Sequence, residues 1–150
     1  MQGELLPNGR REISVLFCDV TGFAELSAKL GDHATAELLQ RFFNIVGQLV
    51  EDHGGVVDKL MGDCVMATFN AVRSRADHKR AAREAARRIV RAVKEIEIDG
   101  DTLNVLVSVE SGEAEVVTFN CGSHSATTVI GELVNRAAVG LRRVPNHNGG

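Results

Sequence analysis

The sequence contains neither tryptophan nor tyrosine, and its six phenylalanines are its only aromatic residues. Proteins that stack on single-stranded nucleic acid use aromatic side chains, so this scarcity argues against a nucleic-acid partner. A net charge of -3 supplies no basic field for nucleic acid or acidic lipid. No apolar run approaches the roughly 18 residues that cross a bilayer, and residues 1–11 lack the apolar stretch of a signal peptide. We therefore expect no membrane segment in this chain.

Cysteine is also scarce. The three cysteines, Cys18, Cys64 and Cys121, are odd in number and lack the spacing of a metal site. We interpret them as buried thiols in a reducing compartment, which makes the cytoplasm the expected location. The length of 150 residues and a hydrophobic share of 44% suit one globular domain. We expect a flexible N-terminal arm over 1–11, a domain over 12–144 and a tail over 145–150.

Hydrophobic periodicity predicts a mixture of strands and helices. Strands are expected over 13–18, 56–61, 64–69, 103–109, 113–119 and 127–130, and helices over 23–30, 32–53, 77–98 and 133–143. Asp32 is the expected N-cap of the second helix. Gly62-Asp63 and Ser111-Gly112 are expected hairpin turns. The order of these elements predicts an α+β fold, a ferredoxin-like sandwich with a mostly antiparallel sheet and helices packed on one face.

Two aspartates are the best evidence for chemistry in this sequence. Asp19 directly follows the strand expected over 13–18. Asp63 lies in the hairpin turn expected between the strands over 56–61 and 64–69. Mg²⁺ is usually held by one or two carboxylates together with substrate phosphates, and two such ions can drive phosphoryl transfer. Taken singly, each aspartate is better explained as a helix cap or a turn residue. The segment Val20–Phe23 strengthens the pair, because a turn that enters a helix directs main-chain amides at one point where a phosphate can bind.

Three segments together carry a resemblance to a known family. Residues 17–23 read Phe-Cys-Asp-Val-Thr-Gly-Phe, residues 53–69 contain Asp-Lys-Leu-Met-Gly-Asp-Cys, and residues 128–138 contain Ile-Gly-Glu-Leu-Val-Asn. Their order and spacing, over residues 12 to about 140, resemble the catalytic domain of class III adenylate and guanylate cyclases. The resemblance implies the nucleotide cyclase fold and the conversion of ATP to 3′,5′-cyclic AMP and pyrophosphate by two Mg²⁺ or Mn²⁺ ions.

The resemblance also implies a role for each matching residue. The metal ligands would be Asp19, Val20 and Asp63, and the triphosphate would bind the main chain of Val20, Thr21, Gly22 and Phe23. Lys59 and Thr128 match the residues that read the base, and Lys59 favours ATP over GTP because guanine-reading members usually carry glutamate there. Asn135 matches the catalytic asparagine that orients the ribose and the reacting phosphate.

The same resemblance implies a dimer. In this family the metal aspartates come from one subunit, whereas the base-reading and asparagine contacts come from the other. The expected partner is therefore a second copy of the chain or another cyclase domain.

The sequence departs from the family pattern in several places. Val139 stands where the family has the arginine that contacts the transition state, and we expect Arg143, one turn further on, to be the only substitute. Phe119 and Asn120 replace small residues, and Glu132 replaces an aspartate. The closing strands, with a phosphate-binding lysine, are missing, which indicates a truncated piece or a minimal domain.

Two other interpretations remain open at this stage. The chain could be a catalytically weak or inactive cyclase-homology module that serves dimerisation or regulation. A relative of polymerase palm domains or diguanylate cyclases would share the sandwich, but this sequence lacks their signature hairpin residues.

Overall fold

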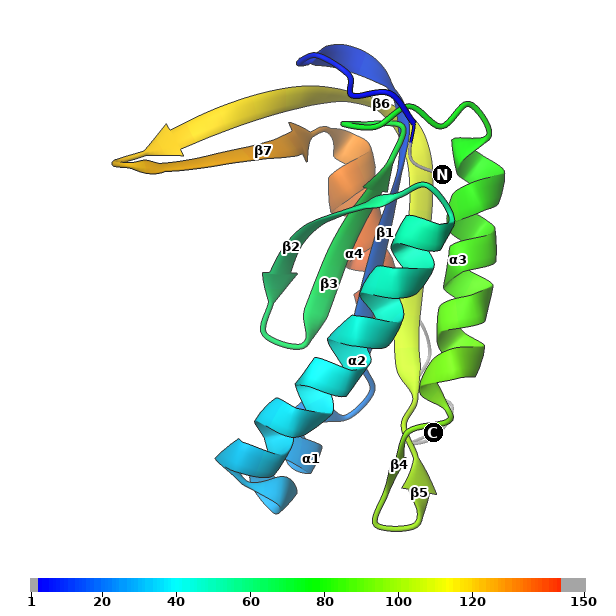
Figure 1. Ribbon diagram of the computed structural model, residues 1–150, viewed down its shortest axis with the longest axis vertical. Coiled ribbons are helices and arrows are strands. Elements are labelled where there is room, and N and C mark those ends of the chain that lie inside the picture. Colours follow the sequence, from blue (N-terminus) through cyan, green and yellow to red (C-terminus); the bar gives the residue numbers. More distant parts are fainter. Residues whose placement is uncertain (1–2, 144–150) are drawn as a thin grey trace.

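The fold is built around β1 (Gly9–Val20), the central strand of a five-stranded antiparallel sheet. The computed structural model describes residues 3–143. The strand order is β2-β3-β1-β6-β7 (Figure 1). Strand β1 pairs with β3 (Cys64–Phe69) and β6 (Val105–Cys121), while β2 (Val56–Met61) pairs with β3 and β7 (His124–Ile130) pairs with β6. The predicted fold class, an α+β protein with an antiparallel sheet, is confirmed.

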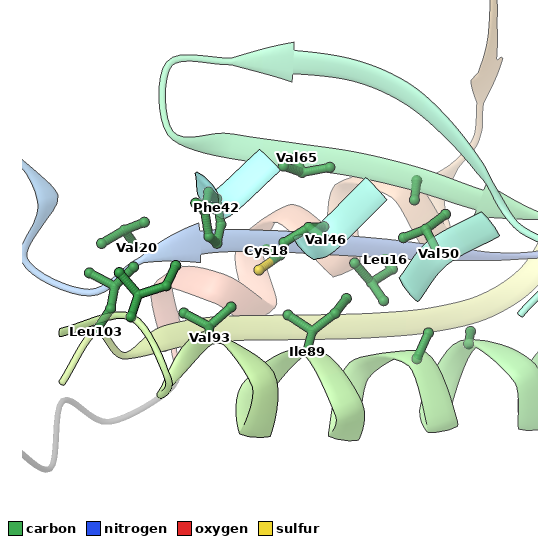
Figure 2. Close-up of a cluster of buried hydrophobic side chains, with 14 of the residues drawn as sticks. Leu16, Cys18, Val20, Phe42, Val46, Val50, Val65, Ile89, Val93 and Leu103 are labelled. Carbon is green, nitrogen blue, oxygen red and sulfur yellow. The ribbon is translucent and has the colours of Figure 1, made fainter. Parts of the chain in front are cut away.

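One face of the sheet packs against three helices. They are α1 (Phe23–Leu30), α2 (Asp32–Asp52) and α3 (His78–Val93). Alternate residues of β1 point to this face, and Figure 2 shows Leu16, Cys18 and Val20 among the buried side chains of α2 and α3. The helical residues labelled there are Phe42, Val46, Val50, Ile89 and Val93. This core fixes the end of β1, where Asp19 lies.

The opposite face of the sheet is covered by α4 (Glu132–Arg143). The intervening residues of β1, Ile13, Val15 and Phe17, are buried in a second core. From α4 this core contains Leu133, Ala137 and Leu141. The expectation of helices on one face therefore holds for α1, α2 and α3, whereas α4 lies on the other. The physical reason is that β1 is apolar at consecutive positions, so both of its faces need cover.

The predicted hairpin turn at Ser111–Gly112 is wrong. Strand β6 runs straight through these residues, and they pair with Ser14 and Ile13 of β1. Because β1 offers hydrogen-bond partners along its whole length, a glycine in β6 does not end the strand. The chain reverses at 122–123 instead and enters β7.

Other element boundaries also differ from the predictions. Strand β1 begins at Gly9, so it includes residues that we placed in the N-terminal arm. Gly31, and not Asp32, is the N-cap of α2. The predicted helix over 77–98 ends at Val93 and is followed by a small hairpin of β4 (Glu97–Ile98) and β5 (Asp101–Thr102). The predicted tail over 145–150 lies outside the described residues.

The small hairpin has a local cause in the sequence. Its turn residues Asp99 and Gly100 both have positive φ, 50° and 85°. An Asp-Gly pair favours this type of two-residue turn, so the sequence did contain a hairpin signal, but the helix predicted over 77–98 took in the residues of β4. Among the described residues, no helix combines the length and apolar character that a membrane crossing requires.

Candidate active site

The register of β1 and β3 brings Asp19 and Asp63 together. Cys18 pairs with Val65, so the residues that follow in β1 lie beside those that precede β3. The main-chain N–H of Val20 donates a hydrogen bond to Asp63 Oδ2 at 3.0 Å. This bond orients the Asp63 carboxylate toward the end of β1. Residues 44 positions apart in sequence thus form one acidic pair.

The acidic pair is electrostatically incomplete. Asp19 Oδ1 is buried and has no hydrogen-bond partner among the described residues. Burial, and after it the negative charge of Asp63, raises the pKa of Asp19. A buried carboxylate beside a like charge is costly unless a cation neutralises it. The pair therefore fits Mg²⁺ or Mn²⁺, which prefer carboxylate oxygens.

The chain supplies only part of a coordination shell. Within residues 3–143, no cluster of three or more histidine, cysteine, aspartate or glutamate side chains could hold a metal ion. Ions held by Asp19 and Asp63 would thus complete their shells with water and phosphate oxygens, as Mg²⁺ commonly does.

We expect Asp19→Asn to stabilise the metal-free protein. Asp19 has a folded-state pKa above its ordinary value of 3.8, so the folded state binds this proton more tightly than the unfolded state. Its contribution to stability is therefore lost as the pH rises from about 4 through the folded-state pKa. At neutral pH, asparagine removes the uncompensated charge and should raise Tm by a few degrees.

Differential scanning fluorimetry in EDTA and in Mg²⁺ would check this prediction. Mg²⁺ should raise the Tm of the wild type and leave that of Asp19→Asn unchanged, with the exposed Asp32→Asn as the matched control. If Asp19→Asn had a lower Tm than the wild type in EDTA, the Asp19 carboxylate would already have favourable partners in the metal-free protein, and the prediction would be wrong.

The turn between β1 and α1 has fewer free amides than the sequence suggested. The N–H of Val20 is bonded to Asp63, and the N–H of Thr21 donates to the carbonyl of Asn104 at 2.9 Å. Gly22 has φ 67° and caps α1, with no side-chain cap. The amides of Gly22 and Phe23 have no acceptor among the described residues, and they lie at the positive end of the helix. The amides of Gly22 and Phe23 are therefore the ones free to receive an anion in this structure, and the predicted triphosphate contact at Val20–Phe23 stays a prediction.

A second polar cluster joins the two outer strands of the sheet. Thr128 of β7 donates its Oγ1 hydrogen to Asp58 Oδ2 of β2 at 2.9 Å. Lys59 Nζ lies 3.6 Å from the same oxygen. Burial raises the pKa of Asp58, while the Thr128 hydrogen bond and the Lys59 charge oppose that rise. Lys59 and Thr128, which we predicted to act together, are thus connected through Asp58.

Asp58 is a site residue that we did not predict from the sequence. Val57 pairs with Ala67 and Lys59 pairs with Met66, so Asp58 is the extra residue of a β-bulge. A bulge turns a side chain away from the simple alternation of a strand, and the Asp58 side chain is only 6% exposed. The one available signal was its position next to Lys59, which is not specific.

Asp19 and Lys59 line one hollow and Asn135 lines a second, while Thr21 and Gly22 line a third, of about 330 Å³. The first, of about 430 Å³, is lined by Asp19 and Lys59 together with Cys64 and apolar residues of α4. The second, of about 410 Å³, is lined by Glu110, Asn135, Arg136, Val139 and Gly140. Asn135 is exposed on α4 and does not share a hollow with the aspartates. One chain therefore brings Asp19, Asp63 and Lys59 to one region and leaves Asn135 in another.

Arg136 is a second residue that we did not predict to lie at the site. It lines the hollow that contains Val139, three residues further along the same helix, where side chains are neighbours. Its Nε lies 3.4 Å from Glu110 Oε1. The side chain of Arg143, which we expected as the substitute, lies outside the described part of the structure.

The three cysteines differ in their surroundings. Cys18 is buried, Cys64 is partly buried and Cys121 is exposed, so the expectation of three buried thiols is wrong for Cys121. Burial raises the pKa of the Cys64 thiol to about 11, with further contributions from Asp19 and Asp63. At neutral pH this thiol is protonated, so it is a packing group and not a nucleophile.

Comparison with known proteins relates this geometry to a family. Residues 7–139 match the family described as the adenylate and guanylate cyclase catalytic domain. An uncharacterized protein of Mycobacterium tuberculosis is 34% identical over 131 residues, which cover 85% of this chain and 22% of the relative. An adenylate cyclase of Anabaena cylindrica is 26% identical over 137 residues, covering 85% of this chain and 26% of that protein. The chain thus spans about a quarter or less of these relatives.

Solved structures agree with the sequence match. The adenylyl cyclase CyaB from P. aeruginosa is 27% identical, with a TM-score of 0.80 over 89% of this chain and 72% of that one. The guanylyl cyclase Cya2, at 24% identity, has the same fold, with a TM-score of 0.80 over 93% of this chain and 71% of that one. The chain therefore belongs to the family of adenylate and guanylate cyclase catalytic domains.

Proposed function

We propose that this domain converts ATP to 3′,5′-cyclic AMP and pyrophosphate at an interface between two cyclase domains. The acidic pair supports the proposal most directly. Asp19 has a buried oxygen that no group within residues 3–143 bonds, and Asp63 is oriented toward it by the N–H of Val20. Such a pair is incomplete without cations, and cations of this kind accompany nucleoside triphosphates.

The residues of the chain divide the work of binding and orientation. Asp19 and Asp63 would hold two Mg²⁺ or Mn²⁺ ions, which when bound stabilise charge on the phosphates and favour ionisation of the ribose 3′-hydroxyl. The amides of Gly22 and Phe23 are available to the triphosphate. Lys59, exposed at the hollow that Asp19 lines, would donate to a ring nitrogen of the base. Guanine presents an N–H at that nitrogen, so a lysine there favours ATP.

A second cyclase domain would complete the site. Asn135 lies in a different hollow from the aspartates, so we propose that it orients the ribose and reacting phosphate of a nucleotide bound by the partner's acidic pair. Orientation of this kind is a large part of phosphoryl-transfer catalysis. Leu60 and Met61, at 52% and 46% exposure, form an apolar edge that such a partner would cover. The partner is a second copy of this chain or another cyclase domain.

The test is a product assay with purified protein, ATP and Mn²⁺ or Mg²⁺. We expect cyclic AMP and pyrophosphate in equal amounts, and neither product with Asp63→Asn. Asparagine retains an oxygen that can accept from the N–H of Val20, so this variant should fold. The exposed Asp32→Asn is the control for a lost carboxylate and should keep wild-type activity. Nucleotide binding without product in the wild type would overturn the proposal.

A further inference from the structure

The hydrogen bond between Thr128 and Asp58 has a defined direction. An ionised carboxylate can only accept hydrogen bonds, and a threonine hydroxyl has one hydrogen and two lone pairs. At 2.9 Å, the single hydrogen of Thr128 is therefore committed to Asp58 Oδ2. Both groups are almost buried, with Thr128 at 8% exposure. Toward any third group, the Thr128 oxygen is then an acceptor only.

The same carboxylate also positions a donor. Lys59 Nζ lies 3.6 Å from the Asp58 oxygen that receives the Thr128 hydrogen, and its side chain is 44% exposed. An ammonium group can donate but cannot accept. Asp58 thus places a donor and an acceptor side by side, with Lys59 as the accessible member of the pair.

This order of donor and acceptor matches one purine edge and opposes the other. Adenine presents a ring nitrogen that accepts beside an exocyclic amine that donates. Guanine presents an N–H that donates beside an oxygen that accepts. A hydroxyl whose hydrogen is free could rotate to donate to guanine, but Thr128 cannot do so while Asp58 holds its hydrogen.

We propose that Asp58 is a positioning residue that makes this site selective for adenine over guanine by fixing the hydroxyl of Thr128 as an acceptor. The inference rests on the proposed function, because it concerns the nucleotide that the cyclase site takes. Asp58 touches Thr128 and Lys59 and acts through them, not on the reacting atoms.

The first experiment replaces Asp58 with asparagine, which keeps its size. An amide that donates to Thr128 leaves the hydroxyl hydrogen free to turn toward guanine. We expect the ratio of kcat/KM for ATP to that for GTP to fall by about 10- to 100-fold, the discrimination provided by one well-placed hydrogen-bond pair. Asp58→Glu keeps the acceptor and should recover part of the ratio.

A binding measurement separates this inference from the proposed function. The 3′-deoxy forms of ATP and GTP, which lack the hydroxyl that cyclises, would each displace a fluorescent ATP analogue from the wild type and from the variants in Mg²⁺. The wild type should prefer ATP, and Asp58→Asn and Thr128→Ala should lose about 10-fold or more of that preference. Thr127→Ala is the matched control, because Thr127 is the exposed neighbour and bonds to Thr118 instead.

Each outcome bears on one of the two claims. A wild type that prefers ATP in binding but makes no cyclic AMP would overturn the proposed function and keep the inference. A wild type that makes cyclic AMP, with Asp58→Asn or Thr128→Ala leaving the ATP:GTP ratio unchanged, would overturn the inference alone. A wild type that binds no nucleotide, or binds both equally, would overturn the inference as well.

Discussion

Mixing Asp63→Asn with Asn135→Ala is expected to restore cyclase activity that neither variant has by itself. Asp63 belongs to the acidic pair, whereas Asn135 lines a hollow that neither aspartate lines, so each pure variant should lose about 10²-fold or more of the wild-type rate. A mixed dimer would have one site with an intact acidic pair and an intact asparagine. In an equal mixture half of the dimers are mixed and each has one good site of two, so about one quarter of the wild-type rate should return.

The controls for this experiment use the same two substitutions. A double variant with Asp63→Asn and Asn135→Ala is mixed with the single variant Asp63→Asn. No chain in this mixture has an intact acidic pair, so the mixture should remain inactive. Asn135 is exposed and Asp63 is only partly buried, so neither substitution should prevent folding, which circular dichroism would verify. If Asn135→Ala is fully active when pure, the asparagine has no role in the reaction. If both pure variants are inactive and the mixture stays inactive, the site is not shared between two copies.

Replacing Val139 with arginine is expected to raise kcat for cyclic AMP formation. Val139 is 37% exposed and lines the hollow that contains Asn135. Arginines that contact the phosphates in phosphoryl transfer contribute about 10³–10⁵ in rate. An arginine introduced at position 139 has no neighbouring groups arranged to hold its guanidinium in place. We therefore expect a smaller gain in kcat, about 10- to 100-fold.

Steady-state kinetics of Val139→Arg, Val139→Lys and Val139→Leu would measure this effect. Lysine adds the positive charge but not the planar set of N–H donors of arginine, and leucine adds only bulk. We therefore expect kcat to be highest for arginine, lower for lysine and lowest for leucine. Glu110 already binds Arg136 at 3.4 Å and can also bind the new side chain, so Glu110→Gln should be tested in the same background. A folded Val139→Arg variant with no gain over leucine would show that the site does not lack an arginine here.

The sequence predicted those parts of the site that depend on neighbouring residues. Asp19 at the end of an apolar run and Gly62-Asp63 at a hairpin tip were found because buried strands and tight turns have local patterns. The resemblance then paired residues of distant segments, such as Lys59 and Thr128. The roles assigned to these residues remain predictions.

The sequence failed where a partner element overrode a local pattern. Ser111–Gly112 looks like a turn by composition, but β1 provides a continuous row of hydrogen-bond partners and keeps β6 straight. Helix spacing alone does not rank Arg136 and Arg143, which lie three residues before and four residues after Val139. The structure shows that Arg136 and Val139 share a hollow with Glu110 of β6.

By itself, the sequence determined the family, through three motifs in a fixed order, and the central strand, through one apolar run. It also placed Asp19 after that strand and Asp63 in a hairpin turn, because both positions have clear local patterns. Only the tertiary structure decided which groups remain without partners and which are joined. The sheet brings Asp58 of one outer strand to Thr128 of the other, 70 residues away, and a bulge turns the carboxylate inward. Hydrogen-bond direction, burial and like-charge repulsion depend on such long-range contacts, so no local pattern could have revealed them.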